Sequence, residues 1–105
     1  MGRFAPSPTG PLHAGSLLAA LGSLLHARAQ GGVWHLRIDD IDPPRAVQGS
    51  VAAIQASLEA HALRFDGDIQ YQSDHSYRYE QALQRLEAQG DLFHCTCTRA
   101  MLGAA

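Results

Sequence analysis

The stretch RFAPSPTGPLHAGS, residues 3–16, decides the fold that this sequence predicts. Its prolines exclude a helix across the first part of the stretch, and a leucine-rich helical pattern begins directly after it. Glycines in such a turn let the backbone come close to a ligand, and the first N–H groups of the following helix hold phosphate oxygens. Taken alone, a proline-rich turn with one histidine is better explained as an ordinary surface loop. The surrounding sequence has to decide between the two interpretations.

The segments around this stretch alternate between strand and helix composition. Runs rich in β-branched and aromatic residues predict strands, and leucines at helical spacing predict helices that end at glycines. Trp34, in one of these strands, is predicted to be a core residue. The order of strands and helices is that of a parallel sheet with crossover helices, which makes this an α/β fold. In chain order we expect a strand over 2–5, a helix capped by Ser16 and ended by Gly31, a strand over 33–38, a helix over 47–58, a strand over 69–72, a helix capped by Ser73 or Asp74 and ended by Gly90, and an extended piece over 92–96.

Composition limits what the chain can bind. With 105 residues it has room for one small domain, and its formal charge of −2 gives no general signal for binding a polyanion. All eight basic residues are arginines, so no lysine of this chain can grip a phosphate or form a Schiff base. The sequence shows neither a signal-peptide pattern nor an apolar run of membrane-spanning length, and we expect a cytoplasmic protein that contacts no membrane.

Several separated motifs resemble the class I aminoacyl-tRNA synthetases, in particular their glutamate-handling branch. The segment PSPTGPLHAGS resembles the ATP-binding HIGH region of that family, and LRIDDIDPPR, FDGDIQYQS and CTCTRA follow in the order that the family has. Within this branch the sequence is most similar to the glutamyl-Q-tRNA(Asp) synthetases, short relatives of glutamyl-tRNA synthetase that lack an anticodon-binding domain. Ser16, where the parent family has a second histidine, and the run DIDPPR favour this subgroup.

The resemblance implies a reaction and a fold. It implies that ATP, handled with Mg²⁺, activates glutamate to glutamyl-adenylate, and that the glutamate is then transferred to the queuosine base of tRNA(Asp). It also implies the N-terminal half of a class I synthetase Rossmann-like parallel sheet, truncated, so that residues 1–105 form a partial nucleotide-binding catalytic domain. The KMSKS loop of the family needs a lysine, which this chain lacks. We therefore expect a missing C-terminal half or a partner chain to complete the site.

The resemblance also implies roles for individual residues. The guanidinium of Arg3 suits the side-chain carboxylate of glutamate, and Asp39 stands where the family has a glutamate that contacts the substrate's ammonium group. Without the resemblance, Arg3 would be taken for a surface arginine, and Arg37 and Arg45 for residues that neutralise the acidic run after the second strand. The implied catalytic residues are His13, Gly15 and Ser16; the implied ATP-binding residues are Pro6, Pro8, His13, Gly15 and Ser16; and the implied glutamate-binding residues are Arg3, Phe4, Ala5, Pro6, Ser7 and Asp39.

The only two cysteines, Cys95 and Cys97, are one residue apart. In an extended segment they are poorly placed to bridge each other, but their thiolates lie on one side of the segment, where they can hold one metal ion. Structural zinc takes four ligands. In the family, a tyrosine and another cysteine further along complete a zinc site, so we expect residues 95–105 to begin the zinc-binding insertion with an incomplete site for Zn²⁺. Two free thiols are the alternative.

Two alternatives to this enzyme stay open from the sequence. A truncated paralogue, or a subunit completed by a separate polypeptide, would bind ATP weakly without catalysis. A glutamyl-tRNA synthetase would charge the 3′ end of the tRNA, which Ser16 and DIDPPR disfavour. Glutamate-dependent exchange of pyrophosphate into ATP separates an active enzyme from the first alternative.

Overall fold

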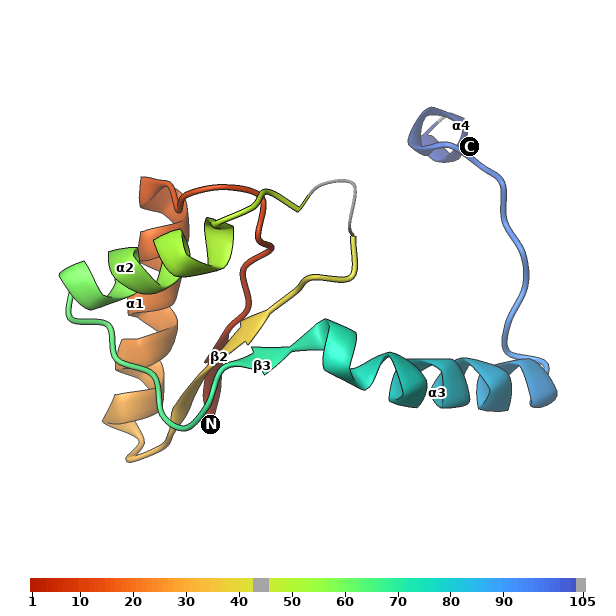
Figure 1. Ribbon diagram of the computed structural model, residues 1–105. Helices are drawn as coiled ribbons and strands as arrows, with labels where there is room; N and C mark the ends of the chain where they lie inside the picture. Colours follow the sequence, from red (N-terminus) through yellow and green to blue (C-terminus); the bar gives the residue numbers. More distant parts are fainter. Residues whose placement is uncertain (43–45, 104–105) are drawn as a thin grey trace. The chain divides into compact units, whose positions relative to one another are not determined.

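The structure is a computed structural model that describes residues 1–42 and 46–103 (Figure 1). The chain divides into two compact units, Met1–His75 and Ser76–Ala105. Arg45, one of the expected partners of the acidic run, lies outside the described residues, as do the last two positions of the expected insertion.

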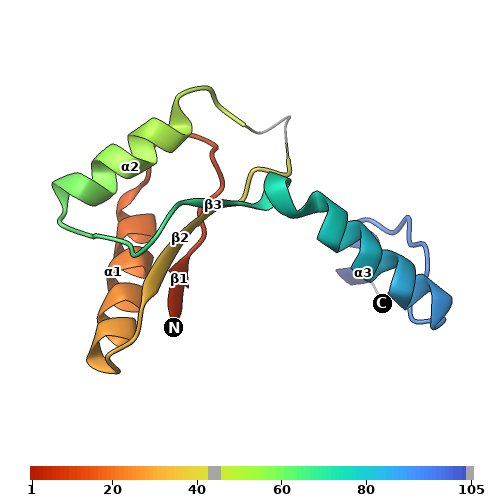
Figure 2. The same ribbon diagram turned by 60° about the horizontal axis from the view of Figure 1, so that its bottom comes forward.

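The first unit contains a three-stranded parallel sheet with the strand order β1-β2-β3. β1 (Gly2–Phe4) pairs with β2 (Trp34–Ile38), which pairs in turn with β3 (Gln70–Tyr71). α1 (Ala14–Ala29) connects the first pair of strands and α2 (Ser50–Ala60) the second pair. Figures 1 and 2 show both helices on the same face of the sheet, as successive crossovers of one handedness require. The predicted α/β fold with crossover helices is confirmed.

The core of the first unit lies between the sheet and its two helices. Along β2 the side chains of Trp34, Leu36 and Ile38 are fully buried, while those of His35 and Arg37 between them are only half-buried. This alternation is that of a strand with one covered face. Trp34 is a core residue, as predicted. The other buried apolar residues are Phe4, Ala20, Ala27, Ile54, Leu58 and Leu63.

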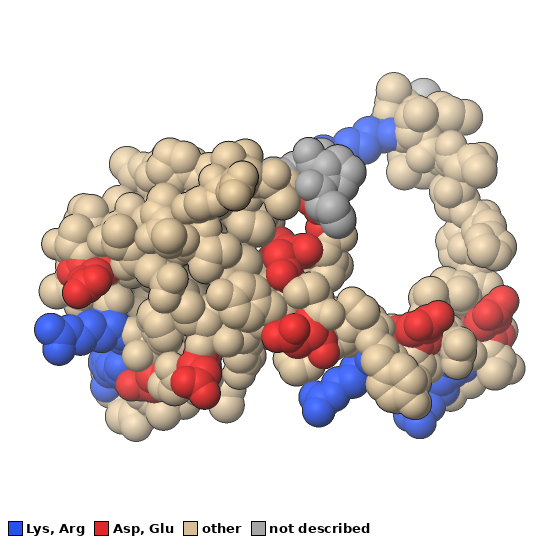
Figure 3. Space-filling model, in the orientation of Figure 1, with Lys and Arg blue, Asp and Glu red and all other residues tan. Residues whose placement is uncertain are grey.

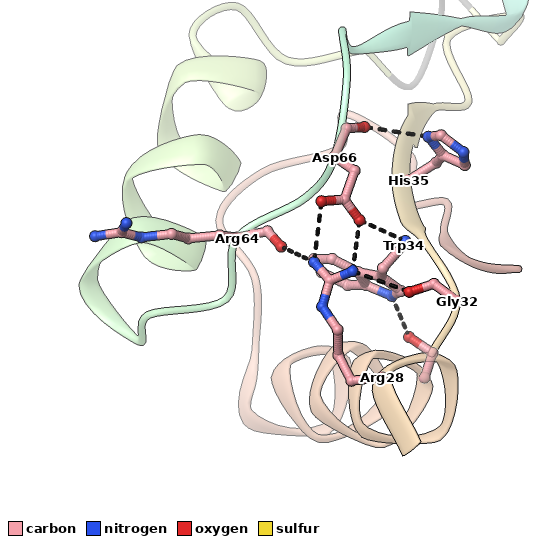
Figure 4. A network of polar contacts seen from close by, with 7 residues as sticks. Arg28, Gly32, Trp34, His35, Arg64 and Asp66 are labelled. Carbon is pink, nitrogen blue, oxygen red and sulfur yellow. Dashed lines mark hydrogen bonds and ion pairs between the residues drawn. The ribbon is translucent and has the colours of Figure 1, made fainter. Parts of the chain in front are cut away.

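An ion pair ties the segment before β3 to the amino end of β2 (Figure 4). The Asp66 carboxylate accepts from both terminal nitrogens of Arg28, at 2.6 and 3.1 Å, and from the backbone N–H of Trp34 at 2.8 Å. Arg28 also donates to the backbone carbonyl oxygens of Gly32 and Arg64. The hydrogen bonds from Arg28, and then that from the Trp34 N–H, hold the pKa of Asp66 below its ordinary value. One carboxylate therefore joins α1, β2 and the segment before β3.

The predicted starts of α2 and of the helix after β3 are wrong. α2 begins at Ser50 rather than Val47, because Gly49 directly before it has a left-handed backbone, with φ 82°, which no α-helix contains. A single 3₁₀ turn, Gln72–His75, precedes α3 (Ser76–Ala88). The two predicted caps of α3 lie inside this turn, one of them bonded to a residue after β2, as described below.

The second unit consists of α3, α4 (Arg99–Gly103) and a segment without regular structure between them. The extended piece expected over 92–96 contains no strand, since the described part of this unit offers no second strand to pair with. Apolar side chains of α3, such as Tyr79 and Leu83, are exposed. No helix in the described part of either unit has both the length and the apolar composition needed to cross a bilayer.

Candidate active site

Two loops meet at the carboxyl edge of the sheet in the first unit. Residues 5–13 follow β1, and an acidic run follows β2. The backbones of the two loops are joined, because the Asp39 N–H donates to the carbonyl oxygen of Pro6 at 3.0 Å. A hydrogen bond from the Val47 N–H to the carbonyl oxygen of Pro8, at 2.8 Å, holds the first loop a second time. Since ligands of open parallel sheets bind beyond the carboxyl ends of the strands, this edge is the candidate active site.

α1 begins with a histidine that caps it. His13 is the N-cap residue, and its Nδ1 accepts the backbone N–H of Ser16 at 3.1 Å. An accepting Nδ1 carries no hydrogen, so Nε2 carries it and donates to the Ser16 hydroxyl, also at 3.1 Å. The prediction that Ser16 caps this helix is therefore wrong, because the ring of His13 lies before it and takes the N–H group that a cap must satisfy.

The first turn of α1 presents open backbone N–H groups. Those of Ala14 and Gly15 are exposed and have no hydrogen-bond partner among the residues that the structure describes. A helix N-terminus with open N–H groups attracts negative charge. A Cβ atom at Gly15 would lie 3.0 Å from Cε1 and 3.1 Å from Nδ1 of His13, so glycine is what leaves the ring in this position. The turn can therefore hold an anion beside the imidazole.

Charge at the surface of the molecule is mixed. Figure 3 shows acidic and basic side chains interspersed on the face drawn, without a continuous basic area. The net charge of −2 agrees with this distribution. A phosphate at the candidate site would accordingly be held by backbone N–H groups and single side chains rather than by a basic surface.

Asp39, directly after β2, forms an ion pair with an arginine of that strand. Arg37 donates from Nε to Oδ1 of Asp39 at 2.5 Å and from a terminal nitrogen to Oδ2 at 3.0 Å. The structure thus confirms the alternative in which Arg37 neutralises Asp39. Each carboxylate oxygen has more than one lone pair, so this paired carboxylate can still accept a hydrogen bond from a second cation. The arginine also holds the carboxylate in one orientation.

A small cavity of about 60 Å³ opens between the two loops at this edge. It brings together three of the predicted site residues, namely Ser7, Pro8 and Asp39. It does not include Arg3 or His13. The other residues of its wall were not predicted from the sequence, although Thr9 stands inside the PSPTG motif. They are Thr9, Asp42 and Ala46.

Arg3 and Phe4 lie on opposite faces of β1. Phe4 is buried, and its ring stacks on that of Trp34 with the ring centroids 6.3 Å apart. Arg3 is exposed, lies beside His35 in the parallel register, and has no hydrogen bond or ion pair to any other described residue. With Gln70, Arg3 and His35 line an open groove on the face of the sheet opposite the helices. Arg3 is therefore available to an anion, whereas only the backbone of Phe4 remains for a ligand.

A second carboxylate of the acidic run is bound to the turn after β3. Asp40 accepts from the backbone N–H of Ser73 at 2.8 Å and from its hydroxyl at 2.6 Å. Burial favours the neutral carboxyl, but the two Ser73 donors outweigh it and hold the pKa of Asp40 below its ordinary value. From the sequence alone Asp40 was interpreted as a cap or turn former, or as a carboxylate that a neighbouring arginine neutralises. A partner 33 positions away leaves no signal in local spacing.

The two cysteines lie in the second unit, and both are exposed and free. The backbone N–H and then the thiol of Cys97 lower the pKa of Cys95. The described residues contain no cluster of three or more histidine, cysteine or acidic side chains that could hold a metal ion. Two thiols do not complete the tetrahedral set of structural zinc, so the residues described do not by themselves fit that ion.

The sequence and the fold match a known class of protein. Residues 1–104 match the family described as tRNA synthetases class I (E and Q), catalytic domain. The chain belongs to this family of ligases, and the resemblance found in its motifs is confirmed.

Curated relatives narrow the comparison within the family. The glutamyl-Q tRNA(Asp) synthetase of Pectobacterium atrosepticum is 56% identical over 102 residues, which cover 97% of this chain and 32% of the relative. That of Xanthomonas campestris pv. campestris is 59% identical over 103 residues, which cover 98% of this chain and 35% of the relative. The chain thus spans about a third of the length of the curated relatives that it matches.

Solved structures agree with the fold. A glutamate tRNA ligase from Elizabethkingia meningosepticum, crystallised with its amino acid, superposes with a TM-score of 0.79 at 32% identity over 97% of this chain and 22% of its own. A glutamate-tRNA synthetase from Elizabethkingia anophelis superposes with a TM-score of 0.69 at 33% identity, over 87% of this chain and 25% of its own. The α/β sheet of the first unit is accordingly that of class I glutamate-tRNA ligases.

Proposed function

We propose that this chain carries the first part of an ATP-dependent, glutamate-activating site, and that the protein transfers the glutamate to queuosine of tRNA(Asp) in the cytoplasm. The observation that carries the proposal is the open first turn of α1 beside the ring of His13, in a chain of the class I synthetase family. Glutamate and ATP would give glutamyl-adenylate and pyrophosphate in the first step.

The proposed ATP contacts lie at the start of α1. The open N–H groups of Ala14 and Gly15 would donate to phosphate oxygens, and the loop containing Pro6 and Pro8 would pack against the nucleotide. As negative charge grows on the α-phosphate during attack by the glutamate carboxylate, the Nε2–H group of His13 would turn from the Ser16 hydroxyl towards it. A donor already placed at a developing charge is the usual source of rate in such chemistry.

The proposed glutamate contacts lie on the sheet. Arg3, whose guanidinium has no partner among the described residues, would bind the side-chain carboxylate. Asp39, oriented by Arg37, would accept a hydrogen bond from the substrate's ammonium group. The backbone of residues 4–7 would line the substrate between these two charges.

The proposed activity also needs metal ions and a further part of the catalytic domain. The nucleotide would carry Mg²⁺, and Cys95 and Cys97 would supply two ligands of a zinc site at the start of an insertion over 95–105. Zinc there needs further ligands from chain beyond this site or from a partner. The whole of 1–105 would then form one partial catalytic domain, completed by a C-terminal half or a second polypeptide that also binds tRNA(Asp).

The test is glutamate-dependent exchange of labelled pyrophosphate into ATP by the purified 105-residue chain. Whatever exchange the chain supports should fall by about 100-fold in His13→Ala and stay unchanged in His26→Ala, a matched change at the far end of α1. ATP binding without exchange would instead support the non-catalytic alternative. Exchange that survives His13→Ala would rule out the proposed role of the first turn of α1.

A further inference from the structure

We propose that Asp40 and Ser73 form a brace that positions the neighbouring Asp39 carboxylate for the ammonium group of the amino-acid substrate. This inference rests on the proposed function, and it adds positioning residues to the proposed glutamate site. The brace is defined by the two hydrogen bonds from Ser73 to the Asp40 carboxylate.

The brace spans the carboxyl edge of the sheet. Asp40 follows β2 and Ser73 follows β3, and these two strands pair with Arg37 opposite Gln70 and Ile38 opposite Tyr71. Beyond the last of these pairs the backbone ladder ends, and the chain after β2 would be free to swing. The Ser73 donors reach across that gap at 2.8 and 2.6 Å. They hold the chain directly after β2 to the rest of the sheet.

Asp39 directly precedes the Asp40 of this brace and makes two contacts of its own. Its own N–H donates to the carbonyl oxygen of Pro6, and its carboxylate is gripped by Arg37. The backbone of Asp39 is therefore held on one side by the loop after β1 and on the other side by the brace. A side chain as short as aspartate depends on its backbone for reach, so a shift of that backbone moves the carboxylate.

The two carboxylates have different partners. Asp40 has each of its oxygens engaged by a Ser73 donor, and its side chain belongs to the structure of the edge. Asp39 is paired with a cation but lines the cavity between the loops. Only Asp39 is thus presented to a ligand, and Asp40 acts on the ligand through it.

The experiment compares two stable adenylate analogues that differ only in the ammonium group. One is a sulfamoyl analogue of glutamyl-adenylate, and the other is its desamino counterpart built on glutarate. Calorimetry with the full chain should show a preference of about tenfold or more for the amino form. We expect Asp40→Ala to reduce this preference by about threefold to tenfold, and Ser73→Ala, which keeps the backbone N–H, to reduce it less.

Conservative and distant changes supply the controls. Ser73→Thr keeps the hydroxyl and should keep the preference, and Ser73→Ala should add nothing to Asp40→Ala. Asp66→Asn, which weakens the ion pair at the other end of β2, should lower the melting temperature without changing the preference.

The outcomes separate the brace from the proposed function. The brace is overturned if Asp40→Ala weakens the binding of both analogues equally. It is also overturned if the preference for the amino form stays unchanged in both single variants, Ser73→Ala and Asp40→Ala. If Asp39→Asn also leaves the preference unchanged, or if the wild-type chain binds neither analogue, the proposed glutamate site is wrong and the brace fails with it. Should Asp40→Ala not fold, a preference that Ser73→Ala lowers and Ser73→Thr restores supports the brace, and an equal preference in both overturns it.

Discussion

Aspartates join distant segments at both ends of β2, but the two ends differ in what they leave open to a ligand. At the amino end, Asp66 is surrounded by donors of its own chain, with Arg28 and the Trp34 N–H on its carboxylate (Figure 4). At the carboxyl end, Asp40 is engaged by Ser73, while Asp39 keeps a face towards a cavity. The contacts at the amino end hold the fold together, whereas the carboxyl end keeps a carboxylate open to a ligand.

The difference follows from the direction of a parallel sheet. The first turns of connecting helices lie at the carboxyl edge, where N–H groups stay without partners inside the chain. The amino edge receives the last turns of helices, and there Arg28 of α1 finds an acidic partner. Changes at the amino end should therefore act on stability, and changes at the carboxyl end on ligand binding.

The largest effect should come from the core at the amino end. Trp34 is fully buried, and its Nε1–H donates to the Ser23 hydroxyl at 2.8 Å. Trp34→Ala should lower the free energy of unfolding by about 3–5 kcal/mol, because it leaves a cavity between the sheet and α1. In a unit of this size that loss should abolish cooperative unfolding in urea. A stable variant with an unchanged transition would mean that the core does not depend on this end of β2.

His13 should separate binding from stability at the other end. His13→Asn keeps an N-cap acceptor, so the melting temperature should stay close to that of the wild type, whereas His13→Ala should cost about 1 kcal/mol. Pyrophosphate exchange should fall by about 100-fold in both variants, because both lack the imidazole donor. Exchange restored by asparagine would show that only the cap matters.

Asp66 should give stability a dependence on acid pH. Its pKa is lowered in the folded chain, first by Arg28, so its contribution is complete above the ordinary aspartate pKa of about 3.9 and disappears as the pH falls through the lowered value. Melting temperatures of the wild type and Asp66→Asn should differ at pH 7 and converge once the pH has fallen below the lowered pKa of Asp66. A difference that persists unchanged in acid would contradict the ion pair.

The smallest effect is expected at Gly15. Alanine there should favour the helix by up to about 1 kcal/mol, but its Cβ would press on the His13 ring at 3.0 Å. We expect Gly15→Ala to melt at the same temperature or slightly higher and to bind the adenylate analogue a few times more weakly. If Gly15→Ala bound the adenylate analogue more tightly than the wild type, binding would not depend on the present position of the His13 imidazole. Gly22→Ala, in the same helix with open space around it, is the matched control.

The sequence by itself determined the order of the strands and helices, the core position of Trp34 and the family of the chain. These follow from local pattern, because periodicity, prolines and glycines report the conformation of their own neighbours. It also indicated which residues stand at the strand–helix joint, since PSPTGPLHAGS is contiguous. Its errors lay at boundaries such as the cap of α1, where the helix begins at Ala14 and the ring of His13 accepts the Ser16 N–H.

Only the tertiary structure decided which side chains meet. The pairs Arg28–Asp66 and Asp40–Ser73 join residues 38 and 33 positions apart, and the bonds from Asp39 to Pro6 and from Val47 to Pro8 bring two loops into one site. None of these contacts has a local spacing to reveal it, because each depends on how parallel strands place distant loops at a common edge. The types of residue at the site could be predicted from the sequence, whereas their hydrogen-bond and ion-pair partners depend on the arrangement of the sheet.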